Sequence, residues 1–270
     1  MSLPSRARPV MLVTGASAGI GAALAREYAG RGWDLVLTAR RAGPLEALAQ
    51  DLAKRGAAAT VLTDDLADPE APARLVAALA ARGLQVDGLC NNAGFSRTTG
   101  FLNTDPADHE AMIRVMLTAP VGLARRLAPA MVERGFGRIL NVASLAGRMP
   151  ATGGDTLYGP IKSFLITASQ GLHLELRGTG VHVTALCPGY TLTEFHDVNG
   201  TRQEVSGAYP AWMWQTAEHV ARVGYEACEA NRPQVTPGVM NTLLAGLAKH
   251  LPDAVALDMV GGHAKRLKRI

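Results

Sequence analysis

The feature that most constrains the fold is a repeated alternation of short, fully apolar runs with stretches rich in Ala and Leu. The apolar runs are "PVMLVTG", "DLVLTA", "AATVLTDD", "VDGLCNNAG", "GRILNVAS" and "VHVTALCPG". A strand that is apolar on both faces is typical of a parallel sheet covered by helices on both sides. The stretches between the runs supply the helical crossovers that parallel strands need. The sequence therefore predicts an α/β fold, a Rossmann-type doubly wound parallel β-sheet with helices on both faces.

The predicted helices and the chain length indicate one domain over residues 1–270. The helical stretches are residues 20–32, 44–56, 69–83, 105–135 and 156–178. The alternation of apolar runs and helical stretches ends at about residue 190, but no linker separates the chain before this point from the chain after it. A chain of 270 residues is long enough for one hydrophobic core. We expect a cofactor-binding core at about 8–190, a C-terminal substrate lid with closing elements at about 190–255, and a basic tail at 256–270.

Composition narrows the class of protein. The chain is 48% hydrophobic and 19% charged, which argues against disorder. Most of its net charge of +4 comes from the tail residues Lys265, Arg266, Lys268 and Arg269. A short basic tail is typically solvated, so we expect no nucleic-acid partner and no membrane contact. The alternative is a membrane-surface protein that uses "GVMNTLLAGLAKHL" and this tail.

Cysteine and histidine usage gives two further expectations. The three cysteines are scattered and odd in number, which predicts a reducing, cytoplasmic location without a disulfide framework. The N-terminal residues contain no apolar stretch of signal-peptide length, and no run has the length of a membrane span. His173, His182, His196 and His219 have no metal-ligand spacing, so no metal site is predicted.

The segment "TGASAGIG" lies between the first strand and the first helix and predicts a dinucleotide phosphate site. Gly15, Gly19 and Gly21 permit a tight turn and a close approach of the backbone to a pyrophosphate. The N-terminus of the next helix adds N–H donors and a positive dipole.

The end of the second strand indicates which dinucleotide binds. A site for NAD usually holds an acidic residue there, to bind the ribose hydroxyls. This chain has Ala39 followed by Arg40 and Arg41, and a guanidinium can bind a 2′-phosphate. We therefore expect NADP(H) in preference to NAD(H). The alternative is that both arginines only begin a surface loop.

Three polar residues form a candidate reaction centre. Tyr158 and Lys162 are four residues apart and share one face of a helix, while Ser144 ends a strand. A nearby ammonium, together with an oxidised nicotinamide, would lower the phenol pKa from its usual value near 10. Tyr158 could then exchange a proton with a carbonyl or alcohol oxygen, to which Ser144 also hydrogen-bonds. The alternative is an ordinary surface Tyr–Lys pair.

Taken together, these motifs resemble those of the classical short-chain dehydrogenase/reductase (SDR) family over essentially the whole chain. The matching pieces are "TGASAGIG", "DDL" at 64–66, "NNAG" at 91–94, Ser144 in "NVASLAG", "YGPIK" at 158–162 and "PGYTLT" at 188–193. The resemblance implies that Lys162 also binds the nicotinamide ribose. It further implies contacts of residues 65–66 with the adenine, 91–94 with the adenosine ribose and 188–193 with the nicotinamide carboxamide. The expected cofactor-binding residues are Gly15, Ser17, Ala18, Gly19, Ile20, Gly21, Arg40, Arg41, Asp65, Leu66, Asn91, Asn92, Ala93, Gly94, Tyr158, Lys162, Pro188, Gly189, Thr191 and Thr193.

The chain departs from the family pattern at Met116. The family usually has an Asn there, in a stretch like "VNLTAP", and its main-chain carbonyl holds a water that connects the lysine to solvent. Pro120 has no N–H for the carbonyl four residues earlier, which is that of Met116. We therefore expect a kinked helix and a proton relay that survives through the main chain. The competing hypothesis is a decayed site from which the Met side chain expels the water.

A milder departure lies between the two predicted catalytic residues. Gly159 and Pro160 are poor helix formers, but Pro is tolerated in a first helical turn. We therefore expect the helix to begin only just before Tyr158.

These observations lead to one main functional hypothesis and one alternative. The main hypothesis is an NADP(H)-dependent oxidoreductase that acts on a small-molecule carbonyl or secondary alcohol. The aromatic patch of Tyr209, Trp212 and Trp214 suggests a bulky, hydrophobic substrate, unless the patch packs the lid onto the body or a partner. The family resemblance implies a homodimer or homotetramer joined through the long helices after strands four and five. The alternative is a catalytically impaired NADP(H)-binding protein with a sensing or interaction role.

Overall fold

The computed structural model describes residues 8–97, 99–151, 154–193, 213–248, 250–252, 254–258 and 261. Seven parallel strands form the central sheet, in the order β3-β2-β1-β4-β5-β6-β9. They are β1 (Val10–Thr14), β2 (Asp34–Ala39), β3 (Ala59–Thr63), β4 (Gly88–Asn91), β5 (Gly137–Val142), β6 (Val181–Leu186) and β9 (Gln234–Val235). The predicted doubly wound parallel sheet is confirmed.

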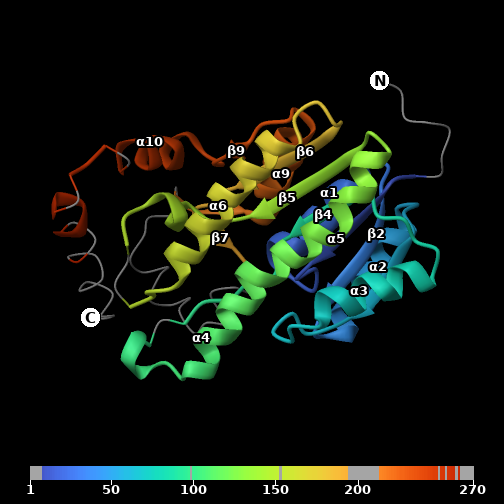
Figure 1. Ribbon diagram of the computed structural model, residues 1–270, viewed down its shortest axis with the longest axis horizontal. Helices are drawn as coiled ribbons and strands as arrows, with labels where there is room; N and C mark the ends of the chain where they lie inside the picture. Colours follow the sequence, from blue (N-terminus) through green and yellow to red (C-terminus); the bar gives the residue numbers. More distant parts are fainter. Residues whose placement is uncertain are drawn as a thin grey trace.

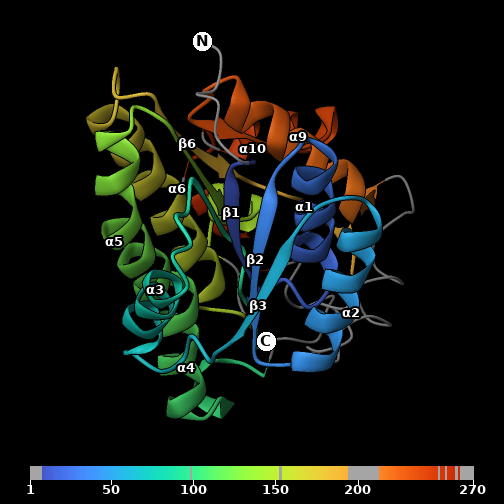
Figure 2. The ribbon, with the colours of Figure 1, turned by 90° about the vertical axis from the view of Figure 1, so that its right-hand side faces the viewer.

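Helices cover both faces of the sheet (Figures 1 and 2). One face carries α1 (Gly19–Gly30), α2 (Ala42–Lys54) and α9 (Ala217–Glu229). The other carries α3 (Ala71–Ala81), α5 (Ala119–Glu133) and α6 (Tyr158–Glu175), with α4 (Pro106–Ile113) leading into α5. Each face has its own apolar core: Leu45, Leu48 and Val220 are buried on the first, and Leu75, Leu123 and Ile161 on the second. Burial on both faces is the reason that the strands are apolar at successive positions.

The helical stretch after β4 is not one regular α-helix. A π-helical turn, Arg114–Thr118, separates α4 from α5, and the N–H of Ala119 donates to the carbonyl of Arg114, five residues earlier. Pro120 lies in the first turn of α5, where it cannot donate to the carbonyl of Met116. The irregularity that the sequence predicted at this place is therefore present, as a π-helical turn.

Shorter elements complete the described structure. The 3-10 turns Phe101–Asn103 and Leu145–Arg148 follow β4 and β5, and β7 (Thr191–Leu192) pairs with β8 (Gln215–Thr216). The last described long helix is α10 (Val239–Ala248). Of the predicted lid, Tyr209, Trp212 and His196 lie outside the described residues, as does the basic tail from 262 onward. Trp214 is described, and its ring lies 5.5 Å from that of Tyr190.

One helical run in the described residues has the length and composition of a membrane span, contrary to the sequence expectation. It is Pro106–Glu133, which includes the π-helical turn. Half of its most apolar window is buried inside the fold. Such burial is typical of the core helix of a globular domain, because its apolar side chains pack against the sheet.

Candidate active site

The site lies where the strand order reverses, between β1 and β4. Ligands of doubly wound sheets bind at the carboxyl ends of the strands at this place. Thr14 Oγ1 accepts hydrogen bonds from the N–H groups of Asn92 (2.9 Å) and Ala93 (3.1 Å). Asn92 Nδ2 in turn donates to the carbonyls of Thr14 (3.0 Å) and Gly15 (3.2 Å). The predicted phosphate loop and the "NNAG" segment are thus joined, although 77 residues separate Asn92 from Gly15.

The glycines of the phosphate loop leave a cradle that side chains would fill. Gly15 and Gly19 have φ of 64° and 56°, which L side chains rarely adopt. A Cβ on Gly21 would lie 2.3 Å from the carbonyl oxygen of Gly15, and one on Gly19 would lie 3.0 Å from Cβ of Thr193. The loop therefore requires glycine at these positions and fits the close approach of a pyrophosphate.

The N-terminus of α1 faces this cradle with no side-chain cap. Its N-cap is Ala18, and among the described residues no side chain caps the helix and no acidic residue lies in its first turn. The first N–H groups of a helix have no partner within the helix, and they bind anions well. Ser17, Ala18 and Ile20 therefore lie where the sequence placed a phosphate.

Arg41 extends from the end of β2 to the phosphate loop. Its guanidinium donates to the hydroxyl of Ser17 at 3.3 Å, while Arg40 is exposed beside it. The positive charge and the hydroxyl thus lie together beside the phosphate loop. This arrangement favours an additional phosphate group on the cofactor.

The three predicted catalytic residues come from β5 and α6. Ser144 follows β5, and its Oγ accepts a hydrogen bond from the N–H of Ala146 at 3.1 Å. Tyr158 is the first residue of α6, as the sequence predicted, with Pro160 in the first turn. Lys162 Nζ lies 5.6 Å from the centre of the Tyr158 ring and donates to the carbonyl of Val142 at 2.8 Å. Residues from two elements therefore converge on one place.

The pKa values in this centre are shifted mainly by burial. The pKa of the Tyr158 phenol is raised, because burial disfavours the phenolate; a hydrogen bond with Ser144 opposes the shift and the charge of Asp155 adds to it. Burial lowers the pKa of the Lys162 ammonium to about 8. In the protein alone, burial therefore determines the direction of the shift of the phenol pKa, and the predicted lowering by the ammonium together with an oxidised nicotinamide stays a prediction. Lys162 is directed to the Val142 carbonyl, and burial of Tyr158 dominates.

Met116 is both a core residue and a neighbour of this centre. It is 1% exposed and lies in the π-helical turn. A Cβ on Gly94 would lie 3.0 Å from Sδ of Met116 and 3.6 Å from Nζ of Lys162. The Met side chain thus packs against Gly94, close to the lysine, and only the main chain of residue 116 can supply a polar group.

Several other predicted cofactor residues lie at this edge of the sheet but use their side chains within the fold. Asn91 is 3% exposed, and its Nδ2 donates to Oδ1 of Asn141 at 2.8 Å. Leu66 is buried, and Asp65 accepts a hydrogen bond from the N–H of Ala67. In the 188–193 segment, the Thr191 hydroxyl donates to the carbonyl of Gly189 at 3.0 Å. We therefore expect these residues to contact a cofactor mainly through their backbone groups.

Sequence reasoning missed two residues beside the site. Asn241 of α10 is 6% exposed, and a Cβ on Gly189 would lie 2.5 Å from its Nδ2, so Asn241 packs against the segment after β6. Ser96 Oγ donates to Oδ2 of Asp155 at 2.6 Å and joins the loop after β4 to the segment before Tyr158. A lone Asn in the apolar stretch "VMNTLL" was the only signal for Asn241 in the sequence.

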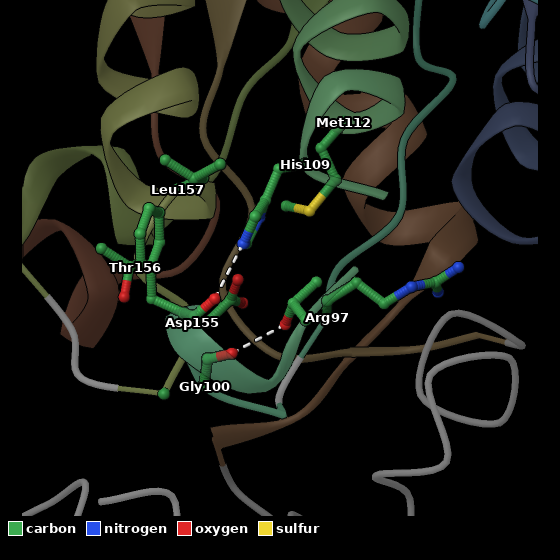
Figure 3. Close-up of a pocket in the computed structure, with 10 residues that line it drawn as sticks. Arg97, Gly100, His109, Met112, Asp155, Thr156 and Leu157 are labelled. Atoms are coloured by element: carbon green, nitrogen blue, oxygen red, sulfur yellow. Dashed lines mark hydrogen bonds between the residues drawn. The ribbon is translucent and has the colours of Figure 1, made fainter. Parts of the chain in front are cut away.

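A small cavity lies between these two loops (Figure 3). Asp155, Thr156 and Leu157 line it together with Arg97 and His109. His109 Nε2 lies 3.1 Å from the carbonyl of Phe101, to which it donates. The cavity therefore lies between the loop after β4 and the segment that leads into Tyr158.

Comparisons with known proteins agree with this geometry. The family model for short chain dehydrogenases matches residues 9–204. The sulfoacetaldehyde reductase of Chromohalobacter salexigens is 38% identical over 215 residues, which are 78% of this chain and 84% of that protein. The serine 3-dehydrogenase of Agrobacterium fabrum is 36% identical, over 80% of this chain and 86% of that one. Among solved structures, a short-chain dehydrogenase from Sphingobium yanoikuyae in complex with NADPH superposes with a TM-score of 0.77 at 32% identity, covering 91% and 97% of the two chains.

Proposed function

The chain belongs to the short-chain dehydrogenase family, and we propose that it is an NADP(H)-dependent oxidoreductase that transfers a hydride between nicotinamide and a carbonyl or secondary alcohol. The observation that carries the proposal is the convergence of Ser144, Tyr158 and Lys162. Strand β5 lies in the same sheet as β1, which leads into the glycine cradle, and α6 packs against β5 and β6. Relatives with dehydrogenase and reductase names support this chemistry.

The glycine cradle, the uncapped N-terminus of α1 and the Arg41–Ser17 pair support NADP(H) as the cofactor. The cradle would take the pyrophosphate, and Arg41 with Ser17 would bind the 2′-phosphate. The related dehydrogenase in complex with NADPH supports the same preference. When bound, the nicotinamide supplies or accepts the hydride.

The residues of the chain bind and orient the substrate oxygen and move its proton. In the reducing direction Tyr158 donates its phenolic proton to the carbonyl oxygen, and Ser144 hydrogen-bonds to the same oxygen. The raised phenol pKa keeps Tyr158 protonated for this step. Lys162 is protonated below about pH 8 and favours the phenolate that remains. The main chain at Met116 and Lys162 would then return a proton from solvent.

A bulky, hydrophobic carbonyl compound is our proposal for the substrate. The contact of the Trp214 ring with Tyr190 places aromatic surface beside the segment after β6. Apolar walls with a few placed polar groups are typical of small-molecule sites. The names of the relatives do not decide the substrate, because they act on different small molecules.

We also propose a cytoplasmic homodimer or homotetramer joined through α5 and α6. The exposed apolar residues Val121, Phe164 and Leu174 on these helices support such an interface. The three described cysteines are free and buried, which suits a reducing compartment. Light scattering on the purified protein measures the assembly.

The proposed reaction is tested by following the absorbance of NADPH, and separately of NADH, with a panel of aliphatic, aromatic and steroid-sized carbonyl compounds. We expect consumption of NADPH with at least one bulky ketone or aldehyde, and slower consumption of NADH. Binding of NADPH without turnover of any carbonyl or alcohol would favour the alternative, a binding protein with an impaired site. Failure to bind either dinucleotide would contradict the proposal.

A further inference from the structure

A hydrogen bond between two distant parts of the chain lies directly before helix α6. Ser96 Oγ donates to Oδ2 of Asp155 at 2.6 Å, across 59 residues of sequence. Ser96 is 4% exposed, so water competes little for its hydroxyl. A hydroxyl that donates to a carboxylate at this distance makes a charge-assisted hydrogen bond, which is roughly twice as strong as a neutral one. The Ser96–Asp155 pair therefore links the loop after β4 strongly to the segment before α6.

This segment forms the turn at which α6 begins. The carbonyl of Asp155 accepts a hydrogen bond from the N–H of Tyr158 at 3.3 Å. The N-cap of the helix is Leu157, and among the described residues no side chain caps it. Pro160 has no N–H, so it adds no backbone hydrogen bond to the first turn. The position of the Tyr158 ring therefore depends on the turn that begins at Asp155.

The loop that carries the donor is itself fixed to the sheet beside the predicted cofactor site. Thr14 Oγ1 of β1 accepts hydrogen bonds from the N–H groups of Asn92 and Ala93. Ser96 follows Ala93 by three residues. The hydrogen bond from Ser96 thus joins the wall of the predicted cofactor site to the turn that carries Tyr158.

Two basic side chains line the small cavity beside Asp155 (Figure 3). Arg97 forms an ion pair with Asp108 at 2.9 Å. His109 Nε2 lies 3.1 Å from the carbonyl oxygen of Phe101. Both basic side chains of the cavity therefore have partners other than the Asp155 carboxylate.

The hydroxyl of Ser96 is a neutral donor, so the pair keeps the negative charge of Asp155 close to Tyr158. Burial is the main cause of the raised pKa of the Tyr158 phenol, and the charge of Asp155 adds to it. A change at Ser96 therefore alters the position of the turn, whereas a change of charge at Asp155 also alters the proton affinity of the phenol.

We propose that Ser96 and Asp155 are positioning residues for the proton transfer at Tyr158. Their hydrogen bond fixes the turn before α6, and it thereby holds the phenolic hydroxyl where Ser144 and the substrate oxygen meet. This proposal rests on the proposed function, because it concerns the group that exchanges the proton there. Both residues act through Tyr158, so loss of either one lowers kcat more than it raises KM.

The test is a double-mutant cycle of Ser96→Ala and Asp155→Ala, measured as kcat for carbonyl reduction with saturating NADPH. We expect each single change to lower kcat by about tenfold, through the loss of one charge-assisted hydrogen bond. The double variant has nearly the same kcat as either single variant, because both changes remove the same link. The KM for the carbonyl substrate and the Kd for NADPH stay within about twofold of the wild type.

Two further variants separate this role from a general effect on the loop. Thr99→Ala is the matched control, because the Thr99 hydroxyl is hydrogen-bonded to that of Thr104 at 2.7 Å in the same loop; it leaves kcat unchanged. Asp155→Asn keeps an oxygen that accepts from Ser96, so kcat at the optimal pH stays within about threefold. The rise of kcat/KM with pH in alcohol oxidation shifts to lower pH in this variant, because the negative charge beside Tyr158 is gone.

Hydrogen exchange of a peptide that spans residues 155–162 tests the same link without turnover. We expect Ser96→Ala to speed this exchange by at least about fivefold, whereas Thr99→Ala leaves it unchanged. A wild type without turnover contradicts the proposed function, and hydrogen exchange then decides alone whether the pair holds the turn. Unchanged exchange in Ser96→Ala overturns the proposal, as does a double variant whose loss of kcat is the product of the two single losses.

Discussion

The helices that follow β4 and β5 both reach the centre of the candidate site, but they contribute different parts of the chain. Helix α6 supplies the side chains of Tyr158 and Lys162 from its first and second turns. The helix after β4 supplies residue 116, whose side chain is an apolar Met, in a π-helical turn followed by Pro120. In the proposed mechanism the role of α6 depends on residue identity, whereas the role of the π-helical turn depends on backbone conformation. A motif position can therefore lose its usual side chain where other residues still determine the local fold.

The largest effect is expected from removing the proton donor in α6. Tyr158→Phe keeps the ring but deletes the hydroxyl, so kcat for carbonyl reduction falls by about 10²- to 10⁴-fold. NADPH binding, followed by fluorescence titration, stays within about threefold of the wild type because no phosphate contact is lost. A variant with more than a tenth of the wild-type kcat would contradict the role given to α6.

The second prediction concerns Lys162 of α6. Burial of its ammonium group lowers the stability of the fold, although the same group has a role in the proposed reaction. The pKa of Lys162 is lowered from 10.5 to about 8, so at neutral pH the folded protein still binds the proton, but less favourably than the unfolded chain does. This cost is fully present below about pH 8 and disappears as the pH rises to about 10.5, where the unfolded lysine also loses its proton. Lys162→Met therefore raises the free energy of unfolding at pH 7 by about 1–3 kcal/mol, while kcat falls by about 10²-fold.

Urea unfolding of the wild type and Lys162→Met at pH 7 and at pH 10.5 measures this difference. We expect the gain in stability to shrink at the higher pH. A variant less stable than the wild type at pH 7 would show that the hydrogen bond to Val142 outweighs the burial of the charge.

The third prediction concerns the cofactor side of the site. Arg41→Ala removes the guanidinium that contacts Ser17, so the Kd for NADPH rises by about 10- to 100-fold, and the Kd for NADH changes little. Arg40→Ala is the matched control with the same charge change and a smaller effect. Equal losses for NADPH and NADH in Arg41→Ala would mean that Arg41 supports the fold and not the 2′-phosphate.

Pro120 tests the π-helical turn directly. Pro120→Ala restores an N–H that can donate to the carbonyl of Met116, so we expect kcat to fall by about three- to tenfold and the solvent isotope effect to increase. Pro129→Ala, at a second proline of α5, is the control and leaves both quantities unchanged. The same loss in both variants would indicate a general effect of helix stability.

Much of the fold follows from the sequence, because buried parallel strands leave an unmistakable run of apolar residues. The start of α6 at Tyr158 also follows, since Pro160 is compatible only with a first turn. The kink near Met116 was predicted from Pro120, but its form as a π-helical turn was not, because that form depends on packing around the whole turn.

Contacts between distant parts of the chain were harder to predict. Asn91 lies in a motif that suggests a ribose contact, yet it is the last residue of β4 and its side chain enters the interior toward Asn141. Neither the Arg41–Ser17 contact nor the packing of Asn241 on Gly189 leaves a local pattern. The exposure of Val239, Leu243 and Leu247 on α10 could not be predicted either. An apolar helix has the same sequence pattern whether its apolar side is buried or exposed.

The most direct test of the central claim compares NADPH oxidation by the wild type and Met116→Asn with the same carbonyl substrate and across the same pH range. If residue 116 acts through its main chain, both proteins are active, their kcat values agree within about threefold and their pH profiles coincide. An inactive wild type together with an active Met116→Asn variant would contradict the claim. This result would show that the Met side chain blocks proton transfer to Lys162.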